Sequence, residues 1–203
     1  MKEDILEQLV DEYLQHKGYF TRHNVKFKPD PSHPEYESKQ DRVASDIDVI
    51  GFNPTLKGSE RVIVVSCKSW QGGFDPDNII KKIEEGKKES GRETWKGFRE
   101  LVKEKWTSAF LDKVEEITES KKFTYITAVT TLKPNANKEK WENYNTFKTA
   151  MRGNPVKILT LNEILDELYR SIERTPAASS VGRLMQIIKA SKWIEKKQRN
   201  LAN

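Results

Sequence analysis

The chain contains a single cysteine, Cys67, and only three histidines in 203 residues. One cysteine excludes an intrachain disulfide framework and any zinc site built on several cysteines. The histidines at positions 16, 23 and 33 are scattered, and their spacing matches no metal-ligand motif. Cys67 lies in an apolar segment, where a small buried residue is favoured over a reactive thiol.

Long apolar runs are also missing. The first residues, Met1 to Asp4, open directly into an amphipathic pattern, and no hydrophobic region typical of a signal peptide precedes it. No apolar run approaches the roughly 20 residues that a membrane-spanning helix needs. We therefore expect a cytoplasmic protein with no membrane partner.

Apolar residues make up only 35% of the chain, and charged residues make up 33%. Leu, Ile, Val and Phe nevertheless follow clear periodicities, which argues against a disordered chain. The length fits one domain with a terminal appendage, and we expect a domain over 1–174 and a linker with a basic helix over 175–203. The net charge of +5 weakly favours a polyanionic partner such as nucleic acid.

The periodicities predict an α/β protein. Helices are expected over 4–17, 77–90, 94–120, 138–151, 162–172 and 181–198, with Asp77 and Asn162 as N-caps. Strands are expected over 19–28, 45–52, 62–70, 122–131 and 155–161. Three consecutive strands favour a meander, and the later strand–helix–strand alternation favours a parallel crossover. The expected fold is a mixed sheet flanked by helices, with an extra C-terminal helix and a proline-rich loop over 29–45.

Two of these strands carry polar side chains where a buried strand should have none. Asp46 and Asp48 share one face of their strand, and Ser66 and Lys68 share one face of the next. If the strands pair, a carboxylate and an ammonium meet at an end of the sheet. Burying either group alone is costly, so a functional site is the first hypothesis. A purely structural ion pair is the alternative.

The pattern resembles the PD-(D/E)XK nuclease superfamily, which has the restriction-endonuclease-like fold. Its signature is an Asp at the end of the second core strand, an acidic residue and a Lys separated by one residue on the third, and often a Glu in the first helix. Asp48 matches the Asp, Lys68 the Lys and Glu7 the helical Glu. The Gly18-Tyr19 pair is similar to the one that opens the first strand in resolvase-like members. As a pattern of elements, the resemblance covers most of 1–172, including an α-β-β-β-α-β core.

The resemblance implies a Mg²⁺-dependent DNA endonuclease in which Mn²⁺ can substitute. Hard cations prefer carboxylate oxygens, and phosphodiester hydrolysis needs an activated water and a stabilised phosphorane. On this interpretation Asp48 and Glu7 bind the metal, and Lys68 orients or deprotonates the attacking water. Asp46 is an alternative ligand, and Pro29-Asp30 repeats the first two letters of the signature within a loop.

The departure from the family lies at Ser66, where the signature usually has Glu or Asp. A Ser-Cys-Lys sequence resembles one restriction-enzyme branch in which the missing carboxylate comes from the helix after the third strand. That helix offers Asp77, Glu84 and Glu85 here, and we assign Glu84 to the metal. Ser66 then holds a metal-bound water or bonds Lys68.

Gln71 follows Lys68 by three residues, as does a glutamine that helps to position the site in some resolvase-like nucleases. A polar turn residue before Gly72-Gly73 is the alternative interpretation of Gln71.

Basic residues around these strands are candidate contacts to DNA phosphates. They are Lys39 and Arg42 before the Asp48 strand, and Lys81 and Lys82 on the helix after the Lys68 strand. A solvated helix face is the alternative for each lysine. The resemblance also implies a homodimer. The C-terminal helix, with apolar residues at 181, 184, 187, 188 and 193, is expected to form its interface or to pack on the domain.

The sequence thus predicts a metal-dependent endonuclease and leaves two other interpretations open. One is a DNA-binding module on the same fold that has lost catalysis because Ser66 replaces the acid. The other is an unrelated α/β protein in which Asp48 and Lys68 form a structural pair.

Overall fold

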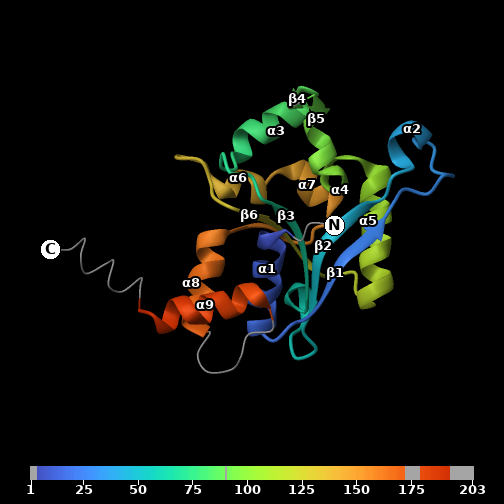
Figure 1. The fold of residues 1–203 in the computed structure, drawn as a ribbon. Helices are drawn as coiled ribbons and strands as arrows, with labels where there is room; N and C mark the ends of the chain where they lie inside the picture. The colour runs from blue at the N-terminus through green and yellow to red at the C-terminus, as the bar shows by residue number, and fades with distance from the viewer. Residues whose placement is uncertain (1–3, 90, 172–178, 193–203) are drawn as a thin grey trace.

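The computed structural model describes residues 4–89, 91–171 and 179–192, and they form three layers with a β-sheet in the middle (Figure 1). The five-stranded sheet has the order β1-β2-β3-β6-β7, with β1 at Phe20–Phe27, β2 at Ser45–Phe52, β3 at Val62–Lys68, β6 at Thr124–Val129 and β7 at Val156–Thr160. β1, β2 and β3 pair in antiparallel fashion, whereas β3, β6 and β7 are parallel. The sheet is therefore mixed, and both the expected meander and the expected parallel crossovers are confirmed.

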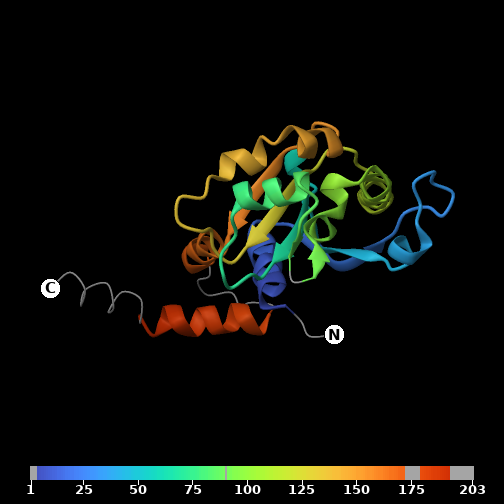
Figure 2. The ribbon, with the colours of Figure 1, turned by 90° about the horizontal axis from the view of Figure 1, so that it is seen from above.

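One face of the sheet is covered by α1 (Ile5–His16), α8 (Leu161–Ser171) and α9 (Ser180–Ala190) (Figure 2). Asp4 caps α1 by accepting a hydrogen bond from the Leu6 N–H. The apolar stripe of α1 packs on the strand residues Val49, Ile63 and Val65. The first turn of α1, with Glu7, is thereby held against the central strands.

The extra C-terminal helix is confirmed as α9, and it contacts α1 and α8. Met185 is buried and Ile188 packs beside it, whereas Leu184 and Ile187 are exposed. The apolar residues of α9 are therefore divided between a packed and an exposed face. The expected linker over 174–180 and the end of the basic helix beyond 192, including the apolar residue at 193, lie largely outside the described residues.

The opposite face is covered by short helices around an aromatic core. The helices are α3 (Pro76–Glu84), α4 (Arg99–Val102), α5 (Glu104–Thr118), α6 (Lys138–Glu142) and α7 (Asn145–Ala150). Phe74, Phe98 and Trp141 lie at the centre, with ring centroids 4.9–6.1 Å apart and steeply inclined planes. Such edge-to-face contacts contribute beyond the apolar area that they bury.

Several expected boundaries were wrong. The helix expected over 94–120 is instead a 3₁₀ turn, η2 (Thr94–Gly97), followed by α4 and α5. The backbone leaves helical geometry at Phe98 and at Lys103. The Phe98 side chain packs in the aromatic core, and the backbone of Lys103 is extended. The helix expected over 138–151 is likewise divided, between α6 and α7.

The helix expected to run to residue 90 ends at Glu84, and an unexpected hairpin of β4 (Lys88–Glu89) and β5 (Arg92–Glu93) follows it. Its N-cap is Asp75 rather than Asp77. Thr160, not Asn162, caps α8 from the position before its first residue: the Thr160 hydroxyl accepts from the Glu163 N–H, and the Glu163 carboxylate accepts from the Thr160 N–H.

The loop before β2 contains the short helix α2 (Ser38–Asp41), and a further 3₁₀ turn, η1 (Gly58–Glu60), joins β2 to β3. Among the described residues, no helix is long and apolar enough to cross a membrane.

Candidate active site

The sheet splits between β2 and β3, and the polar residues of both strands lie at this split. The two strands pair from Phe52↔Val62 to Val49↔Val65 and no further. Beyond that point β2 continues along β1 to Ser45, whereas β3 continues along β6 to Lys68. The split leaves backbone groups of β3 without a partner strand on one side, and it opens a gap next to Asp48.

The Asp48 carboxylate bridges the split. Its Oδ2 accepts a hydrogen bond from the Cys67 N–H at 2.5 Å. A side chain thus replaces the backbone carbonyl that a continuous ladder would supply. The bond fixes the Asp48 carboxylate beside the last residues of β3 and explains why an acid is tolerated in an otherwise apolar strand.

Lys68 lies on the aromatic side of the sheet. Its Nζ donates to the Ser66 Oγ at 2.8 Å and lies 5.4 Å from the centre of the Phe98 ring. The Trp70 ring, which is 37% exposed, packs edge-on against Phe98 and next to Phe74. Cys67 points to the opposite side, into the core under α1, where burial raises the pKa of its thiol well above the ordinary value. The expected assignment of Ser66 and Lys68 to one face and Cys67 to the other is confirmed.

Glu7 and Asp48 repel each other across the split. Burial and then Asp48 raise the pKa of Glu7 from an ordinary value of 4.5 to about 7, with Asp4 and Asp46 adding to the shift and Lys68 opposing it. Burial also raises the pKa of Asp48 from 3.8 to about 6, against the opposing effects of Lys68 and the Cys67 N–H. Burial is the largest cause of both pKa shifts, and repulsion from neighbouring carboxylates adds to it.

Asp46 is the outer member of this group. Its carboxylate forms an ion pair with Lys26 on β1 at 2.6 Å and is partly exposed. Asp46 therefore already has a cationic partner, whereas Glu7 and Asp48 have raised pKa values. This difference favours Asp48 over Asp46 as the residue that faces a ligand.

Glu84, which the sequence suggested as the third carboxylate, makes its hydrogen bond outside the split. Its Oε1 accepts from the Tyr144 hydroxyl at 2.7 Å on the outer side of α3. Glu100 on α4 adds to the raised pKa of Asp48, as the smallest of the contributions after burial, Lys68, the Cys67 N–H and Asp46. Glu100 was missed because the expected continuous helix gave it no distinguishing position. A charged residue between the buried Phe98 and Leu101 was the only signal.

The donor set suits a magnesium ion held by few protein ligands. Within residues 4–89, 91–171 and 179–192, no three or more His, Cys, Asp or Glu side chains are grouped so that they could hold a metal ion. Mg²⁺ keeps several waters and is commonly bound by one or two carboxylates together with substrate phosphates. Two mutually repelling carboxylates, Glu7 and Asp48, match that mode, because a divalent cation would remove their repulsion.

The remaining sequence candidates surround the split at varying distances. Gln71 is an exposed residue of the turn that follows β3. Lys39 and Arg42 are exposed on and after α2, and Lys81 is exposed on α3. Lys82 is half-buried and pairs with Glu89 at 2.9 Å.

The loop that carries α2 is clamped onto α5 by a buried ion pair. Lys105 Nζ lies 2.7 Å from Asp41 Oδ2 and also donates to the Glu35 carbonyl. Asp41 accepts further bonds from the Trp106 indole N–H and from the Glu37 N–H. Burial of Asp41 is outweighed by these partners, so its pKa is lowered. We call this arrangement the loop clamp.

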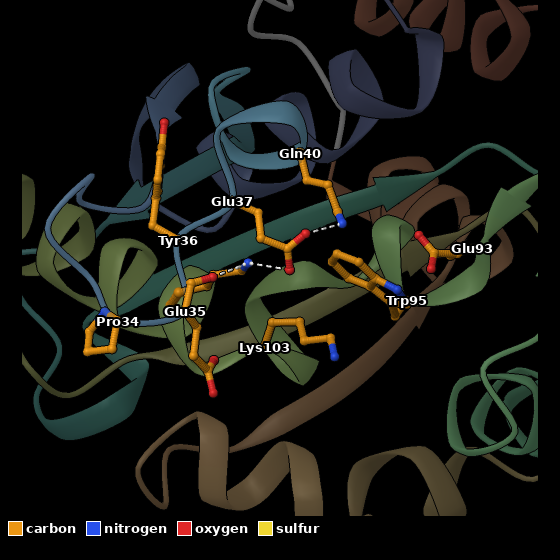
Figure 3. Close-up of a pocket in the computed structure, with 9 residues that line it drawn as sticks. Pro34, Glu35, Tyr36, Glu37, Gln40, Glu93, Trp95 and Lys103 are labelled. Carbon is orange, nitrogen blue, oxygen red and sulfur yellow. Dashed lines mark hydrogen bonds and ion pairs between the residues drawn. The ribbon is translucent and has the colours of Figure 1, made fainter.

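A pocket of about 570 Å³ lies between this loop and the segment from β5 to α5. Figure 3 shows Glu37 and Gln40 on one side and Glu93, Trp95 and Lys103 on the other. A second pocket of about 670 Å³ is lined by Arg42 and residues of β1 and α5. Glu7, Asp48 and Lys68 line neither of these two pockets.

Comparisons with protein-family models, with curated proteins and with solved structures find no match. The mixed five-stranded sheet flanked by helices is compatible with the PD-(D/E)XK fold but not specific to it.

Proposed function

We propose that this protein is a Mg²⁺-dependent DNA endonuclease of the PD-(D/E)XK type that hydrolyses phosphodiester bonds at the split between β2 and β3. The observation that carries the proposal is the convergence of Glu7, Asp48 and Lys68 from three different elements where the sheet opens. A structural Asp–Lys pair is disfavoured, because Asp48 bonds the Cys67 N–H and Lys68 bonds Ser66 rather than each other.

In this proposal Glu7 and Asp48 hold the cation, which when bound supplies a more acidic water and neutralises phosphate charge. Lys68 Nζ has three N–H donors, of which Ser66 takes one. The other two are available to orient the attacking water and to bond a non-bridging phosphate oxygen. The Phe98 ring lies 5.4 Å from the ammonium and limits its hydration, and Trp70 packs edge-on against Phe98.

DNA would be held largely through its phosphates. The exposed cations Lys39 and Arg42, on and after α2, and Lys81 on α3 suit sequence-independent contacts. Lys82, paired with Glu89, is the weaker candidate of the four. A homodimer that cuts both strands stays a prediction of the resemblance.

The direct test is cleavage of a supercoiled plasmid and of a branched DNA in the presence of Mg²⁺ or Mn²⁺. We expect cleavage by the wild type and a loss of at least about a hundredfold in Lys68→Ala and Asp48→Asn. Lys121→Ala is the matched control, because Lys121 is a strongly exposed lysine whose nearest acid is Glu115 on the outer surface of α5. Activity that survives Lys68→Ala would show that the reaction takes place elsewhere.

A lapsed DNA-binding module is the second candidate, and two observations favour it. Ser66 replaces the usual acid, and the described residues hold no preformed group of three metal-ligating side chains. This candidate predicts salt-dependent DNA binding without cleavage at any divalent cation concentration. Binding measured in parallel with cleavage, on the same DNA, therefore separates the two candidates.

A further inference from the structure

The first strand of the sheet, β1, changes the face to which its side chains point. His23 faces α1, where its Nε2 lies 3.0 Å from Asp11 Oδ1. Val25 and Phe27 follow on the same strand and lie in the aromatic core on the opposite face. A regular strand would place residues 23, 25 and 27 on one face, because alternate residues share a face. The alternation of β1 therefore breaks at Asn24.

The partner strand, β2, breaks its alternation at Asp48. Val49 packs under α1, whereas Ile47 lies in the aromatic core. Counted from Ile47, a regular strand would place Asp48 on the α1 face, and counted from Val49 it would place Asp48 on the aromatic face. Asp48 therefore belongs to neither face by alternation.

The hydrogen bond of Asp48 shows where its carboxylate lies instead. Asp48 Oδ2 accepts from the Cys67 N–H at 2.5 Å. The N–H groups of a strand point along the sheet toward the neighbouring strand, so this donor lies in the plane of the sheet. The Asp48 carboxylate consequently lies in that plane, inside the split.

Asn24 has the backbone conformation that goes with the change of face. Its φ is +52°, in the left-handed region that few residues other than glycine adopt and that asparagine tolerates better than most. The pairs that flank it are His23↔Val49 and Val25↔Ile47. They keep one register, so no residue is inserted in either strand. Because paired residues share a face, a change of face at Asn24 requires the same change at Asp48.

A carboxylate in the plane of the sheet can face both sides of the split. Glu7 lies in the first turn of α1, which covers one face. Lys68 lies on the other side, beside the Phe98 ring. On an evenly alternating strand, Asp48 would point toward only one of these two groups.

We propose that Asn24 is a positioning residue whose left-handed backbone switches β1 and β2 between faces and thereby turns the Asp48 carboxylate into the plane of the split, between Glu7 and Lys68. The proposal rests on the nuclease function proposed above for the use that is made of this carboxylate. The placement of Asp48 itself can be tested without metal, DNA or activity.

The first test follows hydrogen–deuterium exchange of the Cys67 amide by NMR, in the full-length protein without metal. The Asp48 carboxylate holds this N–H, so the exchange rate reports on the position of the carboxylate. Asn24→Val should raise the rate about tenfold, because a β-branched residue opposes a left-handed φ. Asn24→Gly should exchange at the wild-type rate, since glycine adopts this φ without strain.

Glu119→Val is the matched control for backbone strain. Glu119 is exposed, has a φ of +53° and follows the last residue of α5. It leads to the start of β6, at the end of the sheet opposite to Lys68. This variant should lower the melting temperature as Asn24→Val does, and it should leave Cys67 exchange at the wild-type rate relative to the other amides of β3.

A double-mutant cycle connects the effect to Asp48. Asp48→Ala removes the acceptor of the Cys67 N–H and should itself raise the exchange rate. Asn24→Val should add nothing in that background, because both changes break the same bond. Multiplicative effects of the two changes would contradict the proposal.

Cleavage of DNA gives the functional readout. Asn24→Val should lower kcat about tenfold and leave KM for DNA unchanged, as expected for a group that acts only on the chemical step. Asn24→Gly should retain the wild-type kcat, which a role of the asparagine side chain in the reaction would not allow.

Wild-type exchange at Cys67 in Asn24→Val would overturn the proposal, as would equally fast exchange in Asn24→Val and Asn24→Gly. If thermal denaturation shows that Asn24→Val is unfolded, Asn24→Ala takes its place, because alanine also disfavours this φ. A wild-type protein that never cleaves DNA would contradict the nuclease function, whereas the exchange result would still decide whether Asn24 places Asp48.

Discussion

Within the part of the chain that the structure describes, the loop clamp and the split each bring an aspartate and a lysine close to one another, but only the loop clamp forms a direct, buried ion pair. In the loop clamp, Asp41 and Lys105 contact each other at 2.7 Å and are 0% and 5% exposed. At the split, Asp48 and Lys68 each bond a different group and remain partly exposed. The pKa of Asp41 is lowered by its partners, whereas burial and nearby carboxylates raise that of Asp48 to about 6.

The loop clamp is an example, within the same chain, of an ion pair whose polar atoms all have hydrogen-bond partners. The loop clamp holds a proline-rich segment in place and leaves no oxygen of Asp41 without a donor. The split instead gathers Glu7, Asp46 and Asp48 near Lys68, and Lys26 forms an ion pair with Asp46. Carboxylates whose pKa values are raised by burial and by neighbouring charges are typical of sites that bind a cation or act on substrate.

The largest expected effect is a difference in unfolding free energy between variants of the loop clamp and variants of the split. Lys105→Met should lower the free energy of unfolding by about 3–5 kcal/mol, because it leaves a buried carboxylate without its cation. Lys68→Met should lower it by about 1 kcal/mol or less, since Asp48 keeps the Cys67 N–H and some solvent. Denaturation in urea measures both. Equal losses would mean that the split is a second structural pair.

The pH dependence of stability should run in opposite directions at the two places. The raised pKa values of Asp48 and Glu7 contribute stability that is present below about pH 4 and is lost as the pH rises through about 6 and about 7. The lowered pKa of Asp41 contributes stability above its ordinary value of 3.8, which is lost as the pH falls through the lowered pKa.

The metal-free wild type should therefore become less stable between about pH 5 and pH 7.5, and Glu7→Gln should flatten this slope. Melting temperatures at several pH values, with and without a chelator, measure the difference between the two proteins. A slope that Glu7→Gln leaves unchanged would show that Glu7 is not perturbed.

A divalent cation should bind at the split and not at the loop clamp, and its binding should stabilise the fold. At a concentration about 100 times Kd, bound Mg²⁺ or Mn²⁺ stabilises the fold by about 2.7 kcal/mol. We expect a rise in melting temperature at pH 7.5 that is absent in Asp48→Asn and Glu7→Gln. Lys82→Ala, on α3, should keep the full rise, and loss of the rise in that variant would point to a different binding place.

The smallest effect concerns the loop that the clamp holds. Arg42→Ala should weaken DNA binding and reduce the dependence of log K on log salt by about 0.9, the contribution of one phosphate contact. Stability should stay within about 0.5 kcal/mol, and cleavage at saturating DNA should be unchanged. A lower kcat in Arg42→Ala would show that Arg42 takes part in the chemical step. It would contradict the view that the loop only binds DNA while the split carries out hydrolysis.

The sequence predicted the parts of the fold that depend on local patterns. The patterns over 45–52 and 62–70 identified β2 and β3, although β3 ends at Lys68, and their polar residues led to the split. The break at Phe98 follows Gly97, a local signal that the expected continuous helix did not use, whereas the break at Lys103 has no helix-breaking residue at that position.

The candidate site was likewise predictable only where its residues belong to elements with clear local patterns. Asp48, Lys68, Ser66 and Glu7 come from elements with clear periodicity, and the structure brings them together. The buried hydrogen bond from the Tyr125 hydroxyl to Glu100 was not found, because the two residues meet only when α4 packs on β6. The loop clamp was missed for the same reason, since Asp41 and Lys105 meet only in the folded chain.

Anomalous diffraction from crystals soaked in Mn²⁺ tests the proposed site most directly. We predict a manganese peak within bonding distance of both the Glu7 and Asp48 carboxylates, next to the Lys68 amine, and no such peak in crystals of Asp48→Asn. A fully occupied manganese ion elsewhere, with Glu7 and Asp48 unliganded, would contradict a metal-dependent site at the split between β2 and β3.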